Sequence, residues 1–145
     1  MTLRILKGVI FLAVRVRIRV QGHGKSVEVT ALANAGAESD EPVIALPQEL
    51  AEELGIRPTV TVTIKEFSAE TLGQVALTKV HVELLGEHNE VLARSWAYPL
   101  IKPGLDEPAL SDALIEELGI IIVHAKRGLW RHTSDPMDKL RPSVK

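Results

Sequence analysis

The sequence contains no cysteine, which excludes disulfide bridges, cysteine nucleophiles and thiolate metal sites. Aromatic residues make up only 3% of the chain, so its apolar side chains are chiefly Val, Leu, Ile and Ala. Asparagine and glutamine are scarce as well, whereas glutamate and arginine are plentiful. This composition favours strands and small helices, and its balance of polar residues is typical of thermophilic proteins.

The chain also lacks a large charge excess and the spacings of common cofactor sites. Its net charge is −2, which gives no electrostatic reason to expect a nucleic-acid or membrane partner. The five histidines show no H-x-x-x-H spacing, and no G-x-G-x-x-G loop occurs. We therefore expect no metal, no cofactor and no nucleic-acid partner.

The most apolar run of the sequence is G-V-I-F-L-A-V, at residues 8–14. Seven residues are too few to cross a bilayer, and no small-residue cleavage site follows them. We therefore expect a cytoplasmic protein without a membrane partner.

Strict alternation over residues 14–20 predicts a half-buried strand that carries Arg15, Arg17 and Arg19 on its outer face. Two roles are open for these arginines. They either contact an anion or a nucleic acid, or they face solvent and prevent the sheet from pairing with another. The second role is favoured because no aromatic residues are interleaved with them.

Short apolar runs between turn residues predict a strand-rich chain. We expect strands over residues 8–20, 27–33, 43–46, 59–67, 74–85, 90–100, 120–124 and 129–132. Two short helices, 48–54 and 110–118, are each closed by a glycine, Gly55 and Gly119. Strands 59–67 and 74–85 should form a hairpin with an exposed tip at 68–73. Residues 1–132 thus form one all-β domain in this prediction, followed by a loose tail at 133–145.

The two helical segments nearly repeat each other. E-E-L-G-I occurs at 52–56 and again at 116–120, and D-E-P precedes each copy, at 40–42 and 106–108. Two interpretations stay open: a duplicated half-domain, or a common way of ending an amphipathic helix.

One loop carries a more specific signal. Residues 31–38 read A-L-A-N-A-G-A-E, and an Asp at 34 with a Thr or Ser at 35 would give A-L-A-D-T-G-A-E. The segments P-Q-E-L-A-E-E-L-G-I, A-L-S-D-A-L-I-E-E-L-G-I and I-I-I-V-H-A-K-R-G-L-W-R-H follow in order. From about residue 27 to 132 the chain resembles the retropepsin-like aspartic peptidases, the single-lobed family that includes retroviral proteases. It looks closest to their divergent prokaryotic members.

This resemblance implies a closed barrel with two short helices and a flap hairpin. It places Asn34 at the position of the family's catalytic Asp, beside Ala35 and Gly36. It also implies a homodimer, because each chain supplies one such loop, and an extended peptide as ligand. The binding residues that it implies are Ala37 and Glu38 after the loop, Ser68, Glu70 and Gly73 in the flap, and Ser111 and Asp112 in the second motif.

The family's chemistry needs two carboxylates that share one proton, one of which accepts a proton from the attacking water. Asn34 has a carboxamide there, so the sequence predicts a relative without ordinary proteolytic activity. Three explanations stay open: a substituted aspartate in an active or formerly active endopeptidase, a peptide-binding or scaffold homodimer, or catalysis by other acids. The candidate acids are Glu38, Asp40, Glu41, Asp106, Glu107 and Asp112. Ser111 or Asp112 also fits a helix N-cap.

Overall fold

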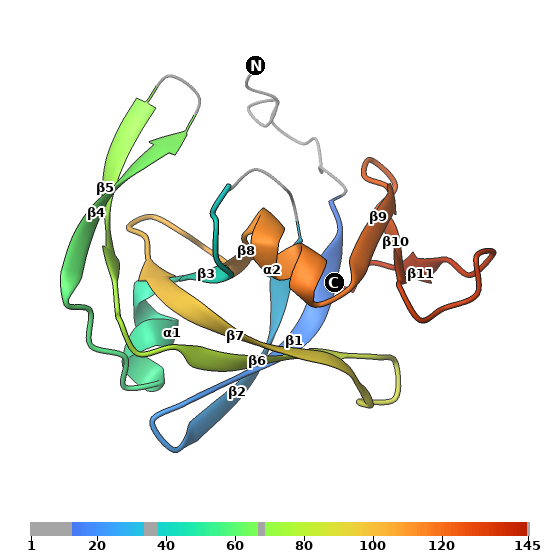
Figure 1. Cartoon of the computed structure of the whole chain (residues 1–145), viewed down its shortest axis with the longest axis horizontal. Helices are drawn as coiled ribbons and strands as arrows, with labels where there is room; N and C mark the ends of the chain where they lie inside the picture. Colours follow the sequence, from blue (N-terminus) through green and yellow to red (C-terminus); the bar gives the residue numbers. More distant parts are fainter. Residues whose placement is uncertain (1–12, 34–37, 67–68, 145) are drawn as a thin grey trace.

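The computed structural model describes residues 13–33, 38–66 and 69–144, with the side chains of 66 and 69 left out (Figure 1). Asn34, Ala35, Gly36 and Ala37 therefore lie outside the described residues, and so does Ser68. Residues 8–12 of the expected first strand lie outside them too. The structure thus tests the surroundings of the candidate loop rather than the loop itself.

The described chain is mostly β, so the expectation of an all-β protein is confirmed at that level. Its strands are β1 (Arg15–Gly22), β2 (Lys25–Leu32), β3 (Val43–Leu46), β4 (Val60–Glu66), β5 (Ala69–Val75), β6 (Val80–Leu85), β7 (Val91–Ile101), β8 (Ala109–Leu110), β9 (Ile120–His124), β10 (Leu129–His132) and β11 (Arg141–Pro142). Its helices are α1 (Gln48–Glu53) and α2 (Asp112–Glu117).

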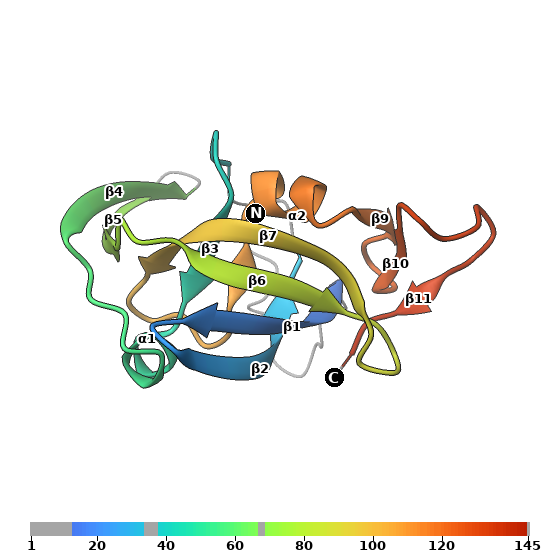
Figure 2. The same ribbon diagram turned by 60° about the horizontal axis from the view of Figure 1, so that its bottom comes forward.

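Two sheets organise these strands. The larger sheet has the order β3-β8-β2-β1-β6-β7-β5-β4, and β3 makes an additional pairing with β7. The smaller sheet has the order β11-β10-β9. Figure 2 shows β2, β1, β6 and β7 side by side across the molecule, with α2 beyond β7 and the small sheet at one end.

The core lies behind the inward faces of the larger sheet. The alternation predicted for the first strand holds, because Val14, Val16, Ile18 and Val20 are all at most 2% exposed. A two-residue turn then joins β1 to β2, with positive φ angles at His23 and Gly24. Two positive φ angles are the backbone of a type I′ turn, whose twist matches that of a hairpin.

The two E-E-L-G segments adopt the same local structure. Each forms a six-residue helix, and each is followed by a glycine with positive φ, 70° at Gly55 and 72° at Gly119. Leu54 and Leu118, just before these glycines, are fully buried. The predicted helices and their glycine ends are therefore confirmed, but the second helix does not begin at Leu110, which belongs to β8 and precedes the cap Ser111. An origin by duplication stays a hypothesis.

The predicted hairpin is present, but its tip and second strand differ from the prediction. Glu66 pairs with Ala69 in the β4–β5 register, so Gly73 lies inside a strand rather than at the tip. The single strand expected over 74–85 is two strands, because β5 ends at Val75 and β6 begins at Val80. Both pair with β7, at opposite ends of it. Periodicity alone could not detect the break, since apolar residues alternate on both sides of it.

The C-terminal segment also departs from the prediction of a loose tail. Residues 133–144 bring β11 onto β10 and return the chain to β1, where the Val144 N–H donates to the Arg15 carbonyl at 3.0 Å. Asp135 and Arg141 form an ion pair at 2.7 Å, and both side chains are only 7% exposed. A buried ion pair therefore holds this segment in place. The sequence predicted a solvated tail because the residues of the segment are polar.

Candidate functional site

Ser111 joins the start of α2 to β3. Its hydroxyl oxygen accepts hydrogen bonds from the Leu114 N–H at 3.2 Å and from the Val43 N–H at 3.0 Å. The Ser111 N–H donates in return to the Val43 carbonyl at 3.0 Å. The first bond is an N-cap, which satisfies a backbone donor that the helix itself leaves unpaired. The N-cap predicted for this position is therefore confirmed at Ser111, which is 2% exposed.

Asp112 connects α2 to the chain that leaves the candidate loop. Its Oδ1 atom accepts from the Ala113 N–H at 2.7 Å and from the Ser39 N–H at 3.1 Å. Both bonds join the Asp112 side chain to backbone N–H groups, one on its own helix and one on the segment before β3. Asp112 therefore holds Ser39, in the segment before β3, against the start of α2.

A cavity of about 620 Å³ opens between these segments and the β4–β5 hairpin. Figure 1 shows that hairpin, at the left, standing beside β3 and the segment that precedes it. One side of the cavity is formed by residues of the two candidate motifs and the other by β4 and its neighbours. The lining residues are Glu38, Ser39, Val43, Val62, Thr63, Ile64, Lys65, Val75, Leu100 and Ser111. We call this cavity the cleft.

The structure brings only some of the predicted binding residues to the cleft. Glu38 and Ser111 line it, and Asp112 supports it through Ser39. Glu70 is exposed on β5, in register with Lys65, but does not line the cleft.

Gly73 has a packing role instead. A Cβ atom there would lie 2.5 Å from Cδ1 of Ile64 and 3.3 Å from the carbonyl oxygen of Ile101. The glycine therefore allows β5 to pass close to β7 and keeps the hairpin next to the cleft. This packing explains why a glycine stands at position 73 without the binding role in a flap that the resemblance implies.

The other acids proposed as substitutes for an aspartate do not gather in the cleft. Glu107 pairs with Arg15 at 2.9 Å, and Glu41 lies 3.8 Å from the Lys79 amine. Asp40 and Asp106 are exposed. Glu38 is the one carboxylate among the described residues that line the cleft. The described residues of a single chain therefore do not place two carboxylates together in the cleft.

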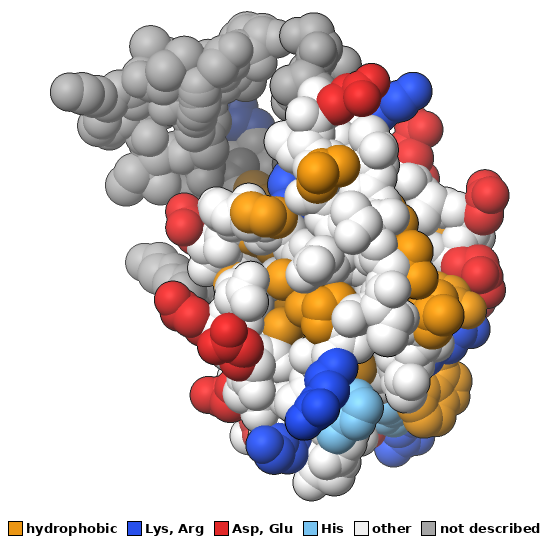
Figure 3. All heavy atoms as spheres, turned by 90° about the vertical axis from the view of Figure 1, so that its left-hand side faces the viewer, with side chains coloured by type: hydrophobic (Ala, Val, Ile, Leu, Met, Phe, Trp, Pro, Cys, Tyr) orange, Lys and Arg blue, Asp and Glu red, His pale blue; other side chains and the backbone are white. Residues whose placement is uncertain are grey.

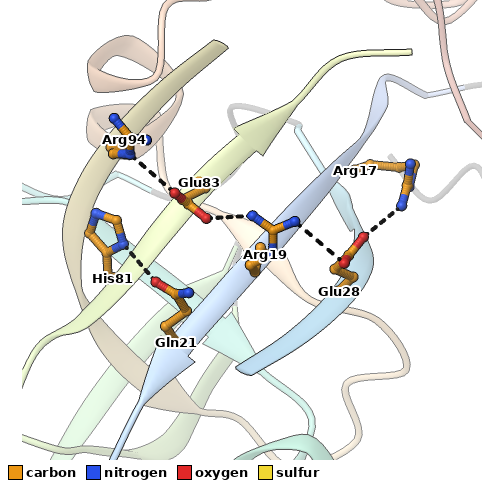
Figure 4. A network of polar contacts seen from close by, with 7 residues as sticks. All are labelled: Arg17, Arg19, Gln21, Glu28, His81, Glu83 and Arg94. Atoms are coloured by element: carbon orange, nitrogen blue, oxygen red, sulfur yellow. Dashed lines mark hydrogen bonds and ion pairs between the residues drawn. The ribbon is translucent and has the colours of Figure 1, made fainter. Parts of the chain in front are cut away.

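The arginines of β1 form a cross-strand network that sequence reasoning missed. Figure 4 shows Arg19 between Glu28 of β2 and Glu83 of β6, with Arg94 of β7 on the far side of Glu83. Hydrogen bonds from Arg19 and then from Arg94 hold the pKa of Glu83 below its usual range. The network leaves these arginines with carboxylate partners, which favours the structural role over an anion site.

A usable signal for this network was present in the sequence. A two-residue turn at 23–24 places Arg19 opposite Glu28, because hairpin register follows from the turn. The partners on β6 and β7 could not be found in that way, since no short turn connects those strands to β1.

The described residues form neither a metal site nor a membrane-spanning helix. No group of three or more His, Asp or Glu side chains among them is arranged to hold a metal ion. None of the helices in the described ranges is both long and apolar enough to cross a membrane.

Comparison with known sequences assigns no family to this chain. A scan against protein-family models found no match, and a search of curated proteins found none either.

Proposed function

We propose that this protein is a relative of the retropepsin-like aspartic peptidases that binds an extended peptide in its cleft and lacks ordinary proteolytic activity. The main support for this proposal is the set of segments that line the cleft. Glu38 and Ser39 follow the candidate loop, Ser111 belongs to the second motif, and β4 belongs to the hairpin, yet all of them line one cavity. The resemblance implies one site made of Glu38, Ser111 and the flap of this hairpin, and the cavity is lined by β4 of the hairpin rather than by Glu70 or Gly73.

The strand pairings support the barrel part of this proposal. In the larger sheet, β3 is the first strand in order and β7 the sixth, and β3 also pairs with β7. That second pairing is parallel and spans Val43–Leu46 against Tyr98–Ile101. Six strands joined in such a ring have the connectivity of a closed barrel.

The lack of proteolysis follows from the side chain at position 34. An aspartate pair can share one proton and activate water, whereas a carboxamide does not accept a proton at any useful pH. Ala35 also lacks the hydroxyl that the family uses to brace two loops. Among the described residues, Glu38 is the one carboxylate that lines the cleft. Within one chain it therefore does not replace the pair of aspartates that the reaction needs.

The walls of the cleft fit an extended peptide. Val43, Val62, Ile64, Val75 and Leu100 offer apolar side chains, while Glu38 and Lys65 offer one charge of each sign. The strand β4 is last in the sheet order, so one of its edges has no partner among the described strands. A peptide strand can add to such an edge through its main chain and place alternate side chains in an apolar cleft.

The proposal includes a homodimer in which two candidate loops face each other. This arrangement would complete the cleft with a second chain. Sedimentation equilibrium at micromolar concentration tests it. A mass of two chains is expected, and a mass of one chain at all concentrations would contradict the dimer.

Peptide binding is tested by fluorescence anisotropy with a labelled, statine-containing apolar peptide. Ile64→Lys puts a charge into the cleft wall and should weaken binding about tenfold or more, which corresponds to about 1.4 kcal/mol. Thr61→Lys is the matched control, because this exposed residue of the same strand does not line the cleft. Equal affinities for the two variants, or no binding by the unmodified chain, would contradict the proposal.

A further inference from the structure

A second region of the molecule, away from the cleft, exposes a large aromatic ring. Trp96 on β7 is 60% exposed, whereas the other tryptophan, Trp130, is 4% exposed. Trp96 stands opposite His81 of β6 in the strand register, and the two ring centroids are 5.0 Å apart at an angle of 56°. His81 thus packs against the indole in a tilted arrangement, while more than half of the Trp96 side chain faces solvent.

The ring borders a groove of about 530 Å³ whose lining carries no Asp or Glu. Residues 21–26 form one wall, and Lys79, His81 and Trp96 form the other. Lys25 and Lys79 bring two amines to the groove, and His23 and His81 bring two imidazoles. Figure 3 shows basic and histidine side chains gathered at the lower end of the face that it views. We call this region the Trp96 groove.

The backbone explains how the groove is built. The two-residue turn at His23 and Gly24 brings Lys25 back beside Gly22. A Cβ atom on Gly22 would lie 3.0 Å from Cγ1 of Val80, so the glycine lets the turn approach the start of β6. Gln21 fixes the imidazole through a 3.1 Å contact between its Oε1 atom and Nδ1 of His81 (Figure 4).

The residues of the turn have the chemistry of an anion site. Gly24, Lys25 and Ser26 supply a glycine backbone, an amine and a hydroxyl in sequence. A strand follows it rather than a helix, so it is not the P-loop arrangement. Across the groove, Lys79 lies 4.9 Å from the Tyr98 ring centroid and forms an ion pair with Glu41 at 3.8 Å, with both side chains partly exposed at 39% and 61%.

The charges around the groove limit the size of its ligand. Farther along the same sheet face, Arg17 and Arg19 are paired with Glu28, and Glu83 lies between Arg19 and Arg94. A long polyanion would meet carboxylates there instead of a continuous basic track. Within the lining of the groove no Asp or Glu accompanies Lys25 and Lys79, and Glu41 reaches Lys79 from outside that lining.

We propose that the Trp96 groove is a binding site for a small phosphorylated ligand with a planar ring, of the nucleoside monophosphate class. The ring stacks on Trp96, and the phosphate lies between Lys25 and Lys79. This site is independent of the peptide cleft, because no residue lines both cavities.

Isothermal titration calorimetry with adenosine monophosphate, adenosine and inorganic phosphate tests the site. The monophosphate should bind about tenfold or more tightly than either fragment, since stacking and charge both contribute. Trp96→Ala and the double variant Lys25→Ala/Lys79→Ala should each weaken its binding about tenfold, while Trp96→Phe should retain most of it. Met137→Ala and Lys126→Ala, which change exposed residues elsewhere, should leave it unchanged.

Three results would overturn the proposal. If inorganic phosphate bound as tightly as the monophosphate, the groove would bind an anion and Trp96 would not stack on the ring. Adenosine that binds as tightly would remove the role of the lysines. No heat with millimolar monophosphate, from a chain whose circular dichroism shows it folded, would remove the site altogether.

Discussion

The backbone N–H of Ser39 donates a hydrogen bond to the Oδ1 atom of Asp112 across a distance of 3.1 Å. The two residues are far apart in the sequence: Ser39 follows the segment A-L-A-N-A-G-A-E, and Asp112 lies within A-L-S-D-A-L-I-E-E-L-G-I. The same carboxylate oxygen accepts from the first turn of α2 at 2.7 Å. The bond therefore sets the position of the chain that leaves the candidate loop relative to α2.

Replacement of Asp112 should destabilise the fold. Asp112→Ala removes the acceptor of two backbone N–H groups, and we expect a loss of about 1–2 kcal/mol in the free energy of unfolding. Urea unfolding followed by circular dichroism measures it. Glu116→Ala, an exposed residue of the same helix, is the control and should cost less than about 0.5 kcal/mol. Equal costs would show that the Ser39–Asp112 bond contributes nothing.

The arginine network offers a matched pair of glutamates. Glu83 and Glu28 each contact two arginines, but their side chains are 9% and 44% exposed. We expect Glu83→Gln to cost roughly 1–2 kcal/mol and Glu28→Gln less than about 1 kcal/mol, because solvent screens the exposed pairs. Chemical denaturation of both variants in the same buffer compares them. A larger loss for Glu28→Gln would reverse this account of the network.

The ion pair between Asp135 and Arg141 should make the stability of the C-terminal segment depend on pH. The Arg141 guanidinium, bonded at 2.7 and 2.9 Å, holds the pKa of Asp135 well below its usual range. A lowered folded-state pKa stabilises the protein above the unfolded value near 4, and this contribution is lost as the pH falls toward the folded value. We expect Asp135→Asn to cost about 3 kcal/mol at pH 7 and clearly less at pH 3.

Thermal unfolding at both pH values measures this effect. Asp138→Asn, an exposed carboxylate in the same segment, should change the midpoint little at either pH. If both asparagine variants behaved alike at pH 7, the ion pair would not be what holds residues 133–144.

Much of the fold could be predicted from the sequence because its signals are local. Alternation predicted β1, and short apolar runs predicted β3, β9 and β10 with the same bounds that these strands have in the structure. Glycine after each E-E-L marked the helix ends, since only glycine takes a positive φ there without strain. These features depend on neighbours in the chain, which a sequence displays directly.

The rest depends on contacts between distant residues. The break between Val75 and Val80 exists because β5 and β6 pair with different parts of β7, and no local pattern records that. Asp135 and Arg141 look like solvated polar residues until the fold buries them together. In the candidate site, Ser111 was predicted as a cap from its place before a helix, whereas its bond to Val43 needed the tertiary structure.

The most direct test of the proposed function is a peptide-cleavage assay from about pH 3 to pH 7, with the unmodified chain, Asn34→Asp and the double variant Asn34→Asp/Ala35→Thr. The aspartate variants restore the acid pair that the chemistry requires, and the pH range spans the titration of such pairs. We predict that the unmodified chain does not cut and that an aspartate variant does, with cleavage blocked by a statine-type inhibitor. Cleavage by the unmodified chain, or by none of the three proteins while all remain folded, would contradict the account.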